Sequence, residues 1–275
     1  MRPSFDVPSA IARTMVERVA VIGSGQMGNG IAQVAACAGF DVIMIDIEQA
    51  FIDKGLVTIE SSLARLVSKE RMMQNEVDEA RGRITTSTEK SACREADLVI
   101  EAIPEVPELK FSTFQELDSI CRPETILATN TSSISISSIA EHTQRQDKVI
   151  GMHFMNPVPI MKLVEVIKTT RTSDETLKTV ISAALKLDKK PIECIDSPGF
   201  ISNRVLMPMI NEAIYSLMEG VATKEAIDEI MILGMSHPMG PLMLADLIGL
   251  DVCLSILNVL KDGFNNNPKY EPCPL

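Results

Sequence analysis

Residues 18–46 read RVAVIGSGQMGNGIAQVAACAGFDVIMID and hold the strongest pattern in the chain. The all-apolar run at 19–22 is typical of a parallel strand that is buried on both faces. A G-x-G-x-x-G turn follows at once, then a helical pattern that ends near Gly39, then a second apolar strand at 41–46. Strand, glycine turn, helix and strand within about thirty residues indicate a βαβ unit.

The glycine turn has the spacing of a dinucleotide-binding loop. Gly23 permits the tight turn, Gly25 lets a pyrophosphate approach the backbone, and Gly28 allows the helix to pack on the sheet. The helix that begins here presents free N–H groups and a partial positive charge to phosphates. Asp46 lies 23 positions beyond Gly23, where a carboxylate accepts hydrogen bonds from ribose hydroxyls. The predicted cofactor-binding residues of this unit are Gly23, Gly25, Gln26, Met27, Gly28 and Asp46.

The residues that follow Asp46 distinguish between the two nicotinamide dinucleotides. Ile47 and Glu48 stand there in place of Arg or Lys, so a ribose 2′-phosphate would be repelled. The sequence therefore predicts NAD as the cofactor. The alternative interpretation is a strand-to-helix turn without a ligand, in which Asp46 caps the following helix.

Strands and helices continue to alternate beyond this unit. Helices are expected as one long polar stretch from about 48 to 80, then at 107–121 and 137–141. Strands are expected at 84–87, 98–103, 125–129, 149–154 and 163–167. After 195–199 the periodicity is helical, with Thr223 as a candidate N-cap. The pattern predicts an α/β fold, with a doubly wound, Rossmann-like, mostly parallel sheet at 1–196 and a smaller all-α C-terminal domain at 197–275.

Composition and charge argue against several classes of function. The chain has 26 basic and 37 acidic residues and a net charge of −11, whereas a nucleic-acid binder needs a dominant basic surface. No stretch approaches the roughly eighteen uninterrupted apolar residues that a bilayer requires. The three histidines and six separate cysteines show no metal-ligand spacing. We therefore expect a soluble protein without a nucleic-acid partner, a membrane partner or a bound metal.

The amino-terminal segment and the cysteines bear on the compartment. Arg2 and Arg13 lie in an N-terminal extension of about seventeen residues, which has no apolar core typical of a secretory signal. Cysteines without pairing motifs favour a reducing compartment. We expect a cytoplasmic protein, with an organelle matrix as the alternative because the extension is slightly basic.

His153 and Glu165 are the candidate catalytic pair. They flank the turn-rich segment NPVPI at 156–160, and they lie opposite each other if the adjoining strands form a hairpin centred on Pro159. A carboxylate beside an imidazole fixes its tautomer and stabilises the imidazolium, which suits proton transfer. The alternative is a hydrogen-bonded core histidine beside an unrelated surface glutamate.

Two further polar clusters are candidates for the same cleft. Residues 129–133, TNTSS, follow an apolar run and so lie at the carboxyl end of a strand, where open α/β sheets bind ligands. Asn203 and Arg204 follow SPGF at 197–200, at the start of the helical domain. Turn or N-cap roles would explain either cluster without a function.

Several separated motifs occur together in a recognisable order. They are the glycine turn at 23–28, NTSS at 130–133, GMHFMNP at 151–157, MKLVE at 161–165, SPGF at 197–200, NEA at 211–213 and HPMGP at 237–241. Together they resemble the L-3-hydroxyacyl-CoA dehydrogenase family, from about Val19 to the end of the chain. The form HFMNP is most similar to the short-chain 3-hydroxybutyryl-CoA dehydrogenases. The resemblance implies an NAD enzyme that interconverts the 3-hydroxyl and 3-keto groups of an acyl-CoA.

The same resemblance implies roles for individual residues. His153 matches the family's catalytic base, and Glu165 matches the acid that orients it. Ser132 matches the serine that contacts the reacting oxygen, and Asn203 matches the asparagine that polarises the substrate carbonyl. The positions that match further dinucleotide contacts, beside Asp46, are Glu105, Lys110 and Asn156.

An acyl-CoA also needs positive charge for its anionic tail. Arg65 and Lys69 lie four residues apart, hence on one face of a helix, and Lys54 is a weaker candidate; a solvated helix face is the alternative. The resemblance implies a homodimer formed through the helical domain. Family members continue past the position of Leu275 through a further helix to a Gly-rich aromatic tail, so we expect an incomplete helical domain here.

Two other functions are compatible with this fold. A dehydrogenase of a sugar acid or of carnitine would share the glycine turn and the His–Glu pair. A non-enzymatic, crystallin-like NAD-binding protein would share the fold alone. The set Ser132, His153, Glu165 and Asn203 argues against the non-enzymatic protein, and the form HFMNP favours an acyl-CoA over the other substrates.

Overall fold

The protein is described by a computed structural model that covers residues 16–275, so Arg2 and Arg13 of the N-terminal extension lie outside the described residues. Contacts divide the chain into two compact units, of which the first ends at Asp196 and the second runs from Ser197 to Leu275. The first unit is built on a sheet, and the second is helical.

The sheet of the first unit has eight strands within the described residues, in the order β3-β2-β1-β4-β5-β6-β7-β8. They are β1 (Arg18–Ile22), β2 (Asp41–Ile45), β3 (Ile84–Ser87), β4 (Leu98–Glu101), β5 (Ile126–Thr129), β6 (Val149–Phe154), β7 (Leu163–Lys168) and β8 (Lys190–Ile195). Neighbouring strands are parallel except for β6 and β7. The predicted doubly wound, mostly parallel sheet is therefore confirmed. The order reverses at β1 and β4, and ligands bind outside the carboxyl ends of the strands at such a switch point.

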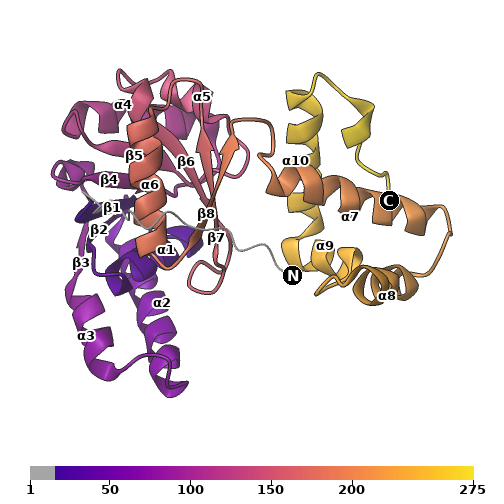
Figure 1. The fold of residues 1–275 in the computed structure, drawn as a ribbon, viewed down its shortest axis with the longest axis horizontal. Coiled ribbons are helices and arrows are strands. Elements are labelled where there is room, and N and C mark those ends of the chain that lie inside the picture. Colours follow the sequence, from indigo (N-terminus) through magenta and orange to yellow (C-terminus); the bar gives the residue numbers. More distant parts are fainter. Residues whose placement is uncertain (1–15) are drawn as a thin grey trace, which may run out of the picture. The chain divides into compact units, whose positions relative to one another are not determined.

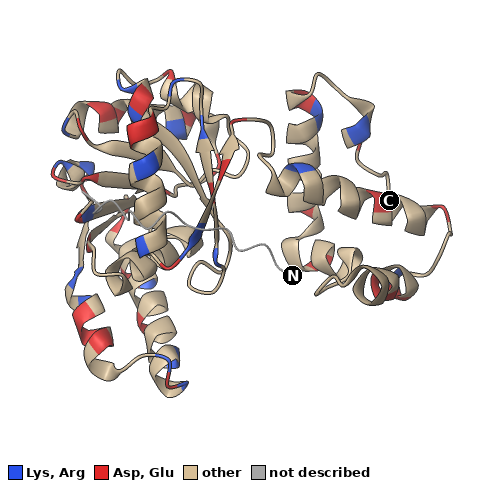
Figure 2. Cartoon of the chain, in the orientation of Figure 1, with Lys and Arg blue, Asp and Glu red and all other residues tan. Residues whose placement is uncertain are grey.

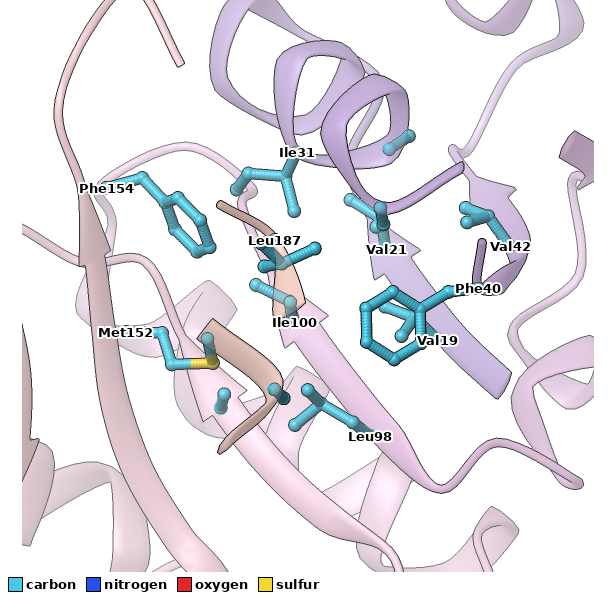
Figure 3. Close-up of a cluster of buried hydrophobic side chains, with 14 of the residues drawn as sticks. Val19, Val21, Ile31, Phe40, Val42, Leu98, Ile100, Met152, Phe154 and Leu187 are labelled. Atoms are coloured by element: carbon cyan, nitrogen blue, oxygen red, sulfur yellow. The ribbon is translucent and has the colours of Figure 1, made fainter. Parts of the chain in front are cut away.

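Helices cover both faces of this sheet. They are α1 (Gln26–Cys37), α2 (Gln49–Ser68), α3 (Gln74–Gly82), α4 (Pro107–Ile120), α5 (Ile136–Ala140) and α6 (Asp174–Lys186), with short 3₁₀ turns η1 (Lys90–Cys93) and η2 (Gln146–Lys148). Figure 1 shows α6 lying across one face of the sheet. The core beneath α1 joins Ile31 to Val21, Ile100 and Phe154 from strands β1, β4 and β6 (Figure 3). Strands β1, β4 and β6 are buried on both faces, which explains why their sequences are nearly continuous apolar runs.

The single long helix expected at 48–80 is wrong, because the chain forms two helices that pack against each other (Figure 1). Glu70 adopts a left-handed backbone conformation with φ of 52°, which ends α2. The Glu76 carboxylate then accepts a hydrogen bond of 2.7 Å from the Met73 N–H and starts α3. Residues 169–196, where no element is predicted from the sequence, form α6 and the edge strand β8.

The helical unit contains α7 (Ser202–Met218), α8 (Lys224–Met235), α9 (Pro241–Ile248), α10 (Leu250–Gly263) and the 3₁₀ turn η3 (Pro268–Tyr270). Its core joins Met207 and Ile210 of α7 to Leu257 and Leu260 of α10. Thr223 caps α8 as predicted, since its hydroxyl accepts a hydrogen bond from the Ala226 N–H. No single described helix is long and apolar enough to cross a membrane, although α9 and α10, bent by 97°, pass that test as a pair.

Candidate active site

The glycine turn is shaped for a ligand at its middle position. Gly23 has φ of 101°, and a Cβ there would lie 2.6 Å from the Ala102 carbonyl oxygen. A Cβ on Gly28 would lie 1.8 Å from the Gly23 carbonyl oxygen, so helix and turn meet without room for a side chain. A Cβ on Gly25 would meet nothing within 4 Å. The two outer glycines therefore serve packing, and the middle one leaves open space above the backbone.

The amino terminus of α1 is suited to bind an anion. Gly25 is its N-cap and provides no side-chain hydrogen bond, and no acidic residue lies in the first turn. The first N–H groups of a helix have no partner within the helix, and the helix dipole places partial positive charge there. This open space and these donors fit the pyrophosphate of NAD.

Asp46 connects the second strand to the glycine turn. Its Oδ2 accepts hydrogen bonds of 2.7 Å from both the N–H and the hydroxyl of Ser24, and its Oδ1 accepts one of 2.8 Å from the Ile47 N–H. Glu48 is the N-cap of α2, so the alternative in which Asp46 caps that helix is wrong. A carboxylate offers about four acceptor positions, which leaves capacity for a ribose hydroxyl.

His153 and Glu165 face each other across the β6–β7 hairpin in the predicted register. His153 Nδ1 lies 2.8 Å from Glu165 Oε2, and both side chains are buried. An ionised carboxylate only accepts hydrogen bonds, so the proton of a neutral imidazole resides on Nδ1. His153 Nε2 is therefore the nitrogen that can take up a proton from a ligand.

The loop of this hairpin is held against the glycine turn. The side-chain amide of Gln26 donates a hydrogen bond of 3.2 Å to Asn156 Oδ1. A Cβ on Gly30 of α1 would lie 2.9 Å from Val158 Cβ, so the loop packs directly on the helix. Asn156 thus lies beside the amino terminus of α1, as a residue that contacts the dinucleotide should. The Asn156–Pro157 peptide bond is cis.

Lys189 is a buried cation that the sequence interpretation missed. Its ammonium donates hydrogen bonds to the carbonyl oxygens of Val158 and Met161, at 2.5 and 2.9 Å. These two bonds hold together the loop between β6 and β7. Burial lowers the pKa of Lys189, and the positive charge of Lys162 adds to this effect against the charge of Asp188. Nothing in the local sequence distinguishes this lysine, because its partners lie about thirty residues away.

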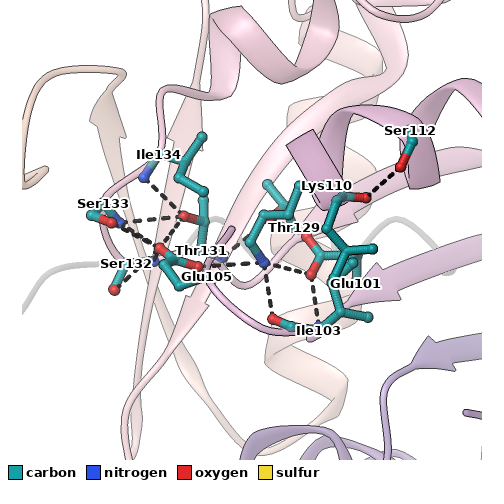
Figure 4. A network of polar contacts seen from close by, with 11 residues as sticks. Glu101, Ile103, Glu105, Lys110, Ser112, Thr129, Thr131, Ser132, Ser133 and Ile134 are labelled. Atoms are coloured by element: carbon teal, nitrogen blue, oxygen red, sulfur yellow. Dashed lines mark hydrogen bonds and ion pairs between the residues drawn. The ribbon is translucent and has the colours of Figure 1, made fainter. Parts of the chain in front are cut away.

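A charged network holds the loop that carries Ser132 (Figure 4). Glu105 Oε1 accepts hydrogen bonds from the backbone N–H groups of Ser132 and Ser133, at 2.9 and 3.1 Å. It also accepts from the hydroxyls of Thr131 at 2.5 Å, Ser133 at 2.9 Å and, more weakly, Ser132 at 3.4 Å. Glu105 and Ser132 are therefore adjacent, although they follow different strands.

Lys110 lies beneath Glu105 and is itself fully buried. Its ammonium is 2.6 Å from Glu101 Oε1, 3.2 Å from the Ile103 carbonyl oxygen and 3.4 Å from Glu105 Oε2. Glu101, which the sequence interpretation missed, also accepts hydrogen bonds from Thr129 Oγ1 and the Ile103 N–H, both 2.7 Å. The only sequence signal for it is an acid within an otherwise apolar strand. The Lys110 ammonium thus donates hydrogen bonds to Glu101 and Ile103 and forms an ion pair with Glu105, so it supports Glu105 electrostatically.

Glu105 should make stability depend on pH. Burial opposes ionisation, but the Lys110 ammonium and the hydrogen bonds from Thr131, Ser133 and Ser132 outweigh it and lower the pKa of Glu105. Its contribution to folding is present above the unfolded-state pKa of about 4.3 and is lost as the pH falls through the lower folded-state value. Urea unfolding from about pH 7 to about pH 3 should show the stability difference between the protein and Glu105→Gln shrinking. A constant difference would contradict this, and Glu108→Gln on the exposed face of α4 is the control.

The remaining predicted residues lie on helices, one in the helical unit and three on or next to α2 of the first unit. Asn203 lies in the first turn of α7 in the helical unit and is buried. Lys54, Arg65 and Lys69 are exposed on α2 or at its C-cap. Lys54 and Arg65 are eleven positions apart on this helix, which is about 16 Å along the axis. Arg65 and Lys69 therefore lie together at the carboxyl end of α2, and Lys54 lies apart from them.

Comparison with known proteins gives matches over most of the chain. Residues 18–197 match the model of the 3-hydroxyacyl-CoA dehydrogenase NAD binding domain, and 199–275 match that of the C-terminal domain. A probable 3-hydroxybutyryl-CoA dehydrogenase of Bacillus subtilis is 54% identical over 94% of this chain and 90% of its own. The 3-hydroxybutyryl-CoA dehydrogenase of Bradyrhizobium diazoefficiens is 49% identical over 95% and 89%. The crystal structure of (S)-3-hydroxybutyryl-CoA dehydrogenase from Ralstonia eutropha superposes with a TM-score of 0.91, at 47% identity over 94% and 90% of the two chains.

Proposed function

Because the chain belongs to the 3-hydroxyacyl-CoA dehydrogenase family and is an NAD-dependent oxidoreductase, we propose that its substrate is (S)-3-hydroxybutyryl-CoA. We propose His153 and Glu165 as the pair that transfers the proton. The observation that carries this proposal is the buried 2.8 Å contact between His153 Nδ1 and Glu165 Oε2. This contact keeps the imidazole proton on Nδ1, so Nε2 can accept the proton of the substrate hydroxyl.

Each proposed residue has one task in the reaction. NAD, when bound, accepts the hydride from C3 of the substrate. His153 Nε2 removes the hydroxyl proton, and the Glu165 carboxylate stabilises the imidazolium that forms. Ser132 and Asn203 donate hydrogen bonds to substrate oxygens whose charge changes during the reaction. In the reverse direction the His153 imidazolium returns the proton to the keto oxygen.

The residues that would hold NAD form a continuous set in the first unit. The α1 amino terminus, with Gly23, Gly25, Gln26, Met27 and Gly28, would hold the pyrophosphate, and Asp46 would accept a hydrogen bond from a ribose hydroxyl. Asn156, which bonds to Gln26, would contact the dinucleotide from the hairpin loop, while Glu105, supported by Lys110, lies next to Ser132. We assign the CoA phosphates to Arg65 and Lys69, and Lys54 to a weaker contact. Figure 2 shows basic residues at the end of the α2–α3 pair that is remote from the sheet.

A substrate panel tests the activity. Among (S)-3-hydroxyacyl-CoAs with chains from C4 to C16, the C4 compound (S)-3-hydroxybutyryl-CoA should give the fastest NAD reduction. Gulonate and carnitine should give none. NADP should be the poorer cofactor, because Asp46 and Glu48 repel a 2′-phosphate. Turnover of gulonate or carnitine instead would favour the sugar-acid or carnitine alternative. NADH binding without any turnover would favour the crystallin-like one.

The helical unit has an apolar surface suited to a second copy of the chain. Leu233 of α8 is 80% exposed, Leu247 of α9 is 70% exposed, and α8 has no buried residue in the described structure. Large apolar side chains that are exposed on helices in contact with each other, as α8 and α9 are, mark an interaction surface. We assign it to a homodimer, which the family resemblance also implies.

Light scattering after size exclusion tests the homodimer. The protein should elute at about twice the 30.1 kDa of one chain, and Leu233→Glu with Leu247→Glu should reduce the mass to that of one chain. Val57→Glu, at an exposed apolar position of α2, should leave the dimer intact. A monomeric unsubstituted protein would remove the proposal.

We further propose a cytoplasmic location, with an organelle matrix as the alternative, because all six cysteines are free thiols.

A further inference from the structure

Asp196 is the last residue of the first unit and makes three hydrogen bonds that the proposed reaction does not use. Its Oδ2 accepts from the Ser137 N–H at 2.8 Å, the Ser137 hydroxyl at 2.7 Å and the Ser135 hydroxyl at 2.9 Å. Ser135 is the N-cap of α5. Donors that converge on one ionised oxygen form charge-assisted hydrogen bonds, which are stronger than neutral ones.

Residues 197–200, which follow Asp196, are held by contacts within the helical unit. The Ser197 carbonyl oxygen accepts a hydrogen bond of 2.8 Å from the Phe200 N–H, and its hydroxyl accepts one of 3.3 Å from Arg204. A Cβ on Gly199 would lie 2.5 Å from Leu260, and one on Gly263 would lie 2.6 Å from Pro198. Each end of the connection is therefore anchored within its own unit, by Asp196 in the first and by the turn at 197–200 in the second.

The α5 turn held by Asp196 continues directly from the Ser132 loop. Glu105 fixes residues 131–133 of that loop, and Asp196 fixes residues 135 and 137. The two carboxylates thus hold the loop before and after Ile134. Unlike Glu105, Asp196 is followed directly in the chain by Ser197, the first residue of the helical unit.

We propose that Asp196 is a positioning residue that couples the start of the helical unit to the Ser132 loop. The inference rests on the proposed role of Ser132 at the reacting oxygen. The Asp196 carboxylate holds the last residue of the first unit against the α5 turn. Because that turn continues from the Ser132 loop, loss of the carboxylate should shift Ser132 from its position at the reacting oxygen.

The test is steady-state reduction of acetoacetyl-CoA by Asp196→Asn, combined with NADH affinity from fluorescence titration. We expect kcat to fall by about tenfold, because small misplacement of a reacting group costs up to about 10²-fold, while NADH affinity changes by less than about twofold. Asp78→Asn, which removes an exposed carboxylate of α3 in the same unit, is the control and should leave kcat unchanged. Equal losses of kcat and NADH affinity would indicate general damage and overturn the proposal.

A double-mutant cycle with Ser132→Ala separates this inference from the proposed function. If Asp196 acts through the Ser132 loop, Asp196→Asn should lower kcat by less than about twofold in the Ser132→Ala background. The same tenfold loss in both backgrounds would overturn the coupling and leave the role of Ser132 intact. A Ser132→Ala variant with unchanged kcat would instead remove that role. Ser137→Ala, which deletes one donor and keeps the carboxylate, should show a smaller loss of the same kind if Asp196→Asn does not fold.

Discussion

His153→Asn should lower kcat for oxidation of (S)-3-hydroxybutyryl-CoA by a factor of about 10² to 10⁴, the range that general base catalysis contributes. The substitution removes Nε2 but retains a side-chain N–H that can donate to Glu165. The buried carboxylate therefore keeps a partner, and the fold should lose little stability. NADH affinity should be unchanged, because the glycine turn and α1 are not altered.

His142→Asn is the matched control for this experiment. His142 belongs to the same unit, is exposed, and bonds to the Ser138 carbonyl oxygen while stacking on Phe111 at 4.2 Å. It should keep full turnover. If His153→Asn retained wild-type turnover at saturating substrate and cofactor, His153 would not be the base, and the hairpin would be a structural feature only.

The parts of the site that the sequence predicts are those that depend on local spacing. The turn at 23–28 is decided within six residues, and its packing follows from where a Cβ does not fit. The contact between His153 and Glu165 depends on one assumption, the centre of the hairpin, because antiparallel pairing then fixes every opposed pair. A one-residue slip would have placed the two side chains on opposite faces.

The parts that the sequence does not predict depend on partners far along the chain. Glu101 is stabilised by Lys110 and Thr129, and Lys189 by carbonyl oxygens of the hairpin loop. Asp196 bonds to serines about sixty positions away. No periodicity or motif records such contacts. The break between α2 and α3 escaped prediction for another reason, since a polar helix can end through a single residue in the left-handed region.

Lys110→Met should produce the largest loss of stability among single substitutions in the network of Figure 4. Lys110 and Glu101 are 2.6 Å apart, with side chains 1% and 0% exposed. Removing the cation leaves the Glu101 charge buried without its counter-charge, which costs about 3–5 kcal/mol in comparable sites. Urea unfolding at neutral pH measures this. Lys90→Met, which breaks the partly exposed pair between η1 and Glu116 of α4, should cost less than about 1 kcal/mol.

The double variant Glu101→Gln with Lys110→Met decides why the loss occurs. If the cost of Lys110→Met is the uncompensated charge of Glu101, neutralising that charge should restore part of the stability, so the double variant should unfold at higher urea than the single one. The amide oxygen that replaces the carboxylate can still accept from the Ile103 N–H, which limits any new unsatisfied group. A double variant less stable than Lys110→Met would show that packing of the lysine stem dominates. Because Glu105 bonds to Lys110 on one side and to the Ser132 loop on the other, the charge-based outcome would also make this ion pair the support on which the loop is built.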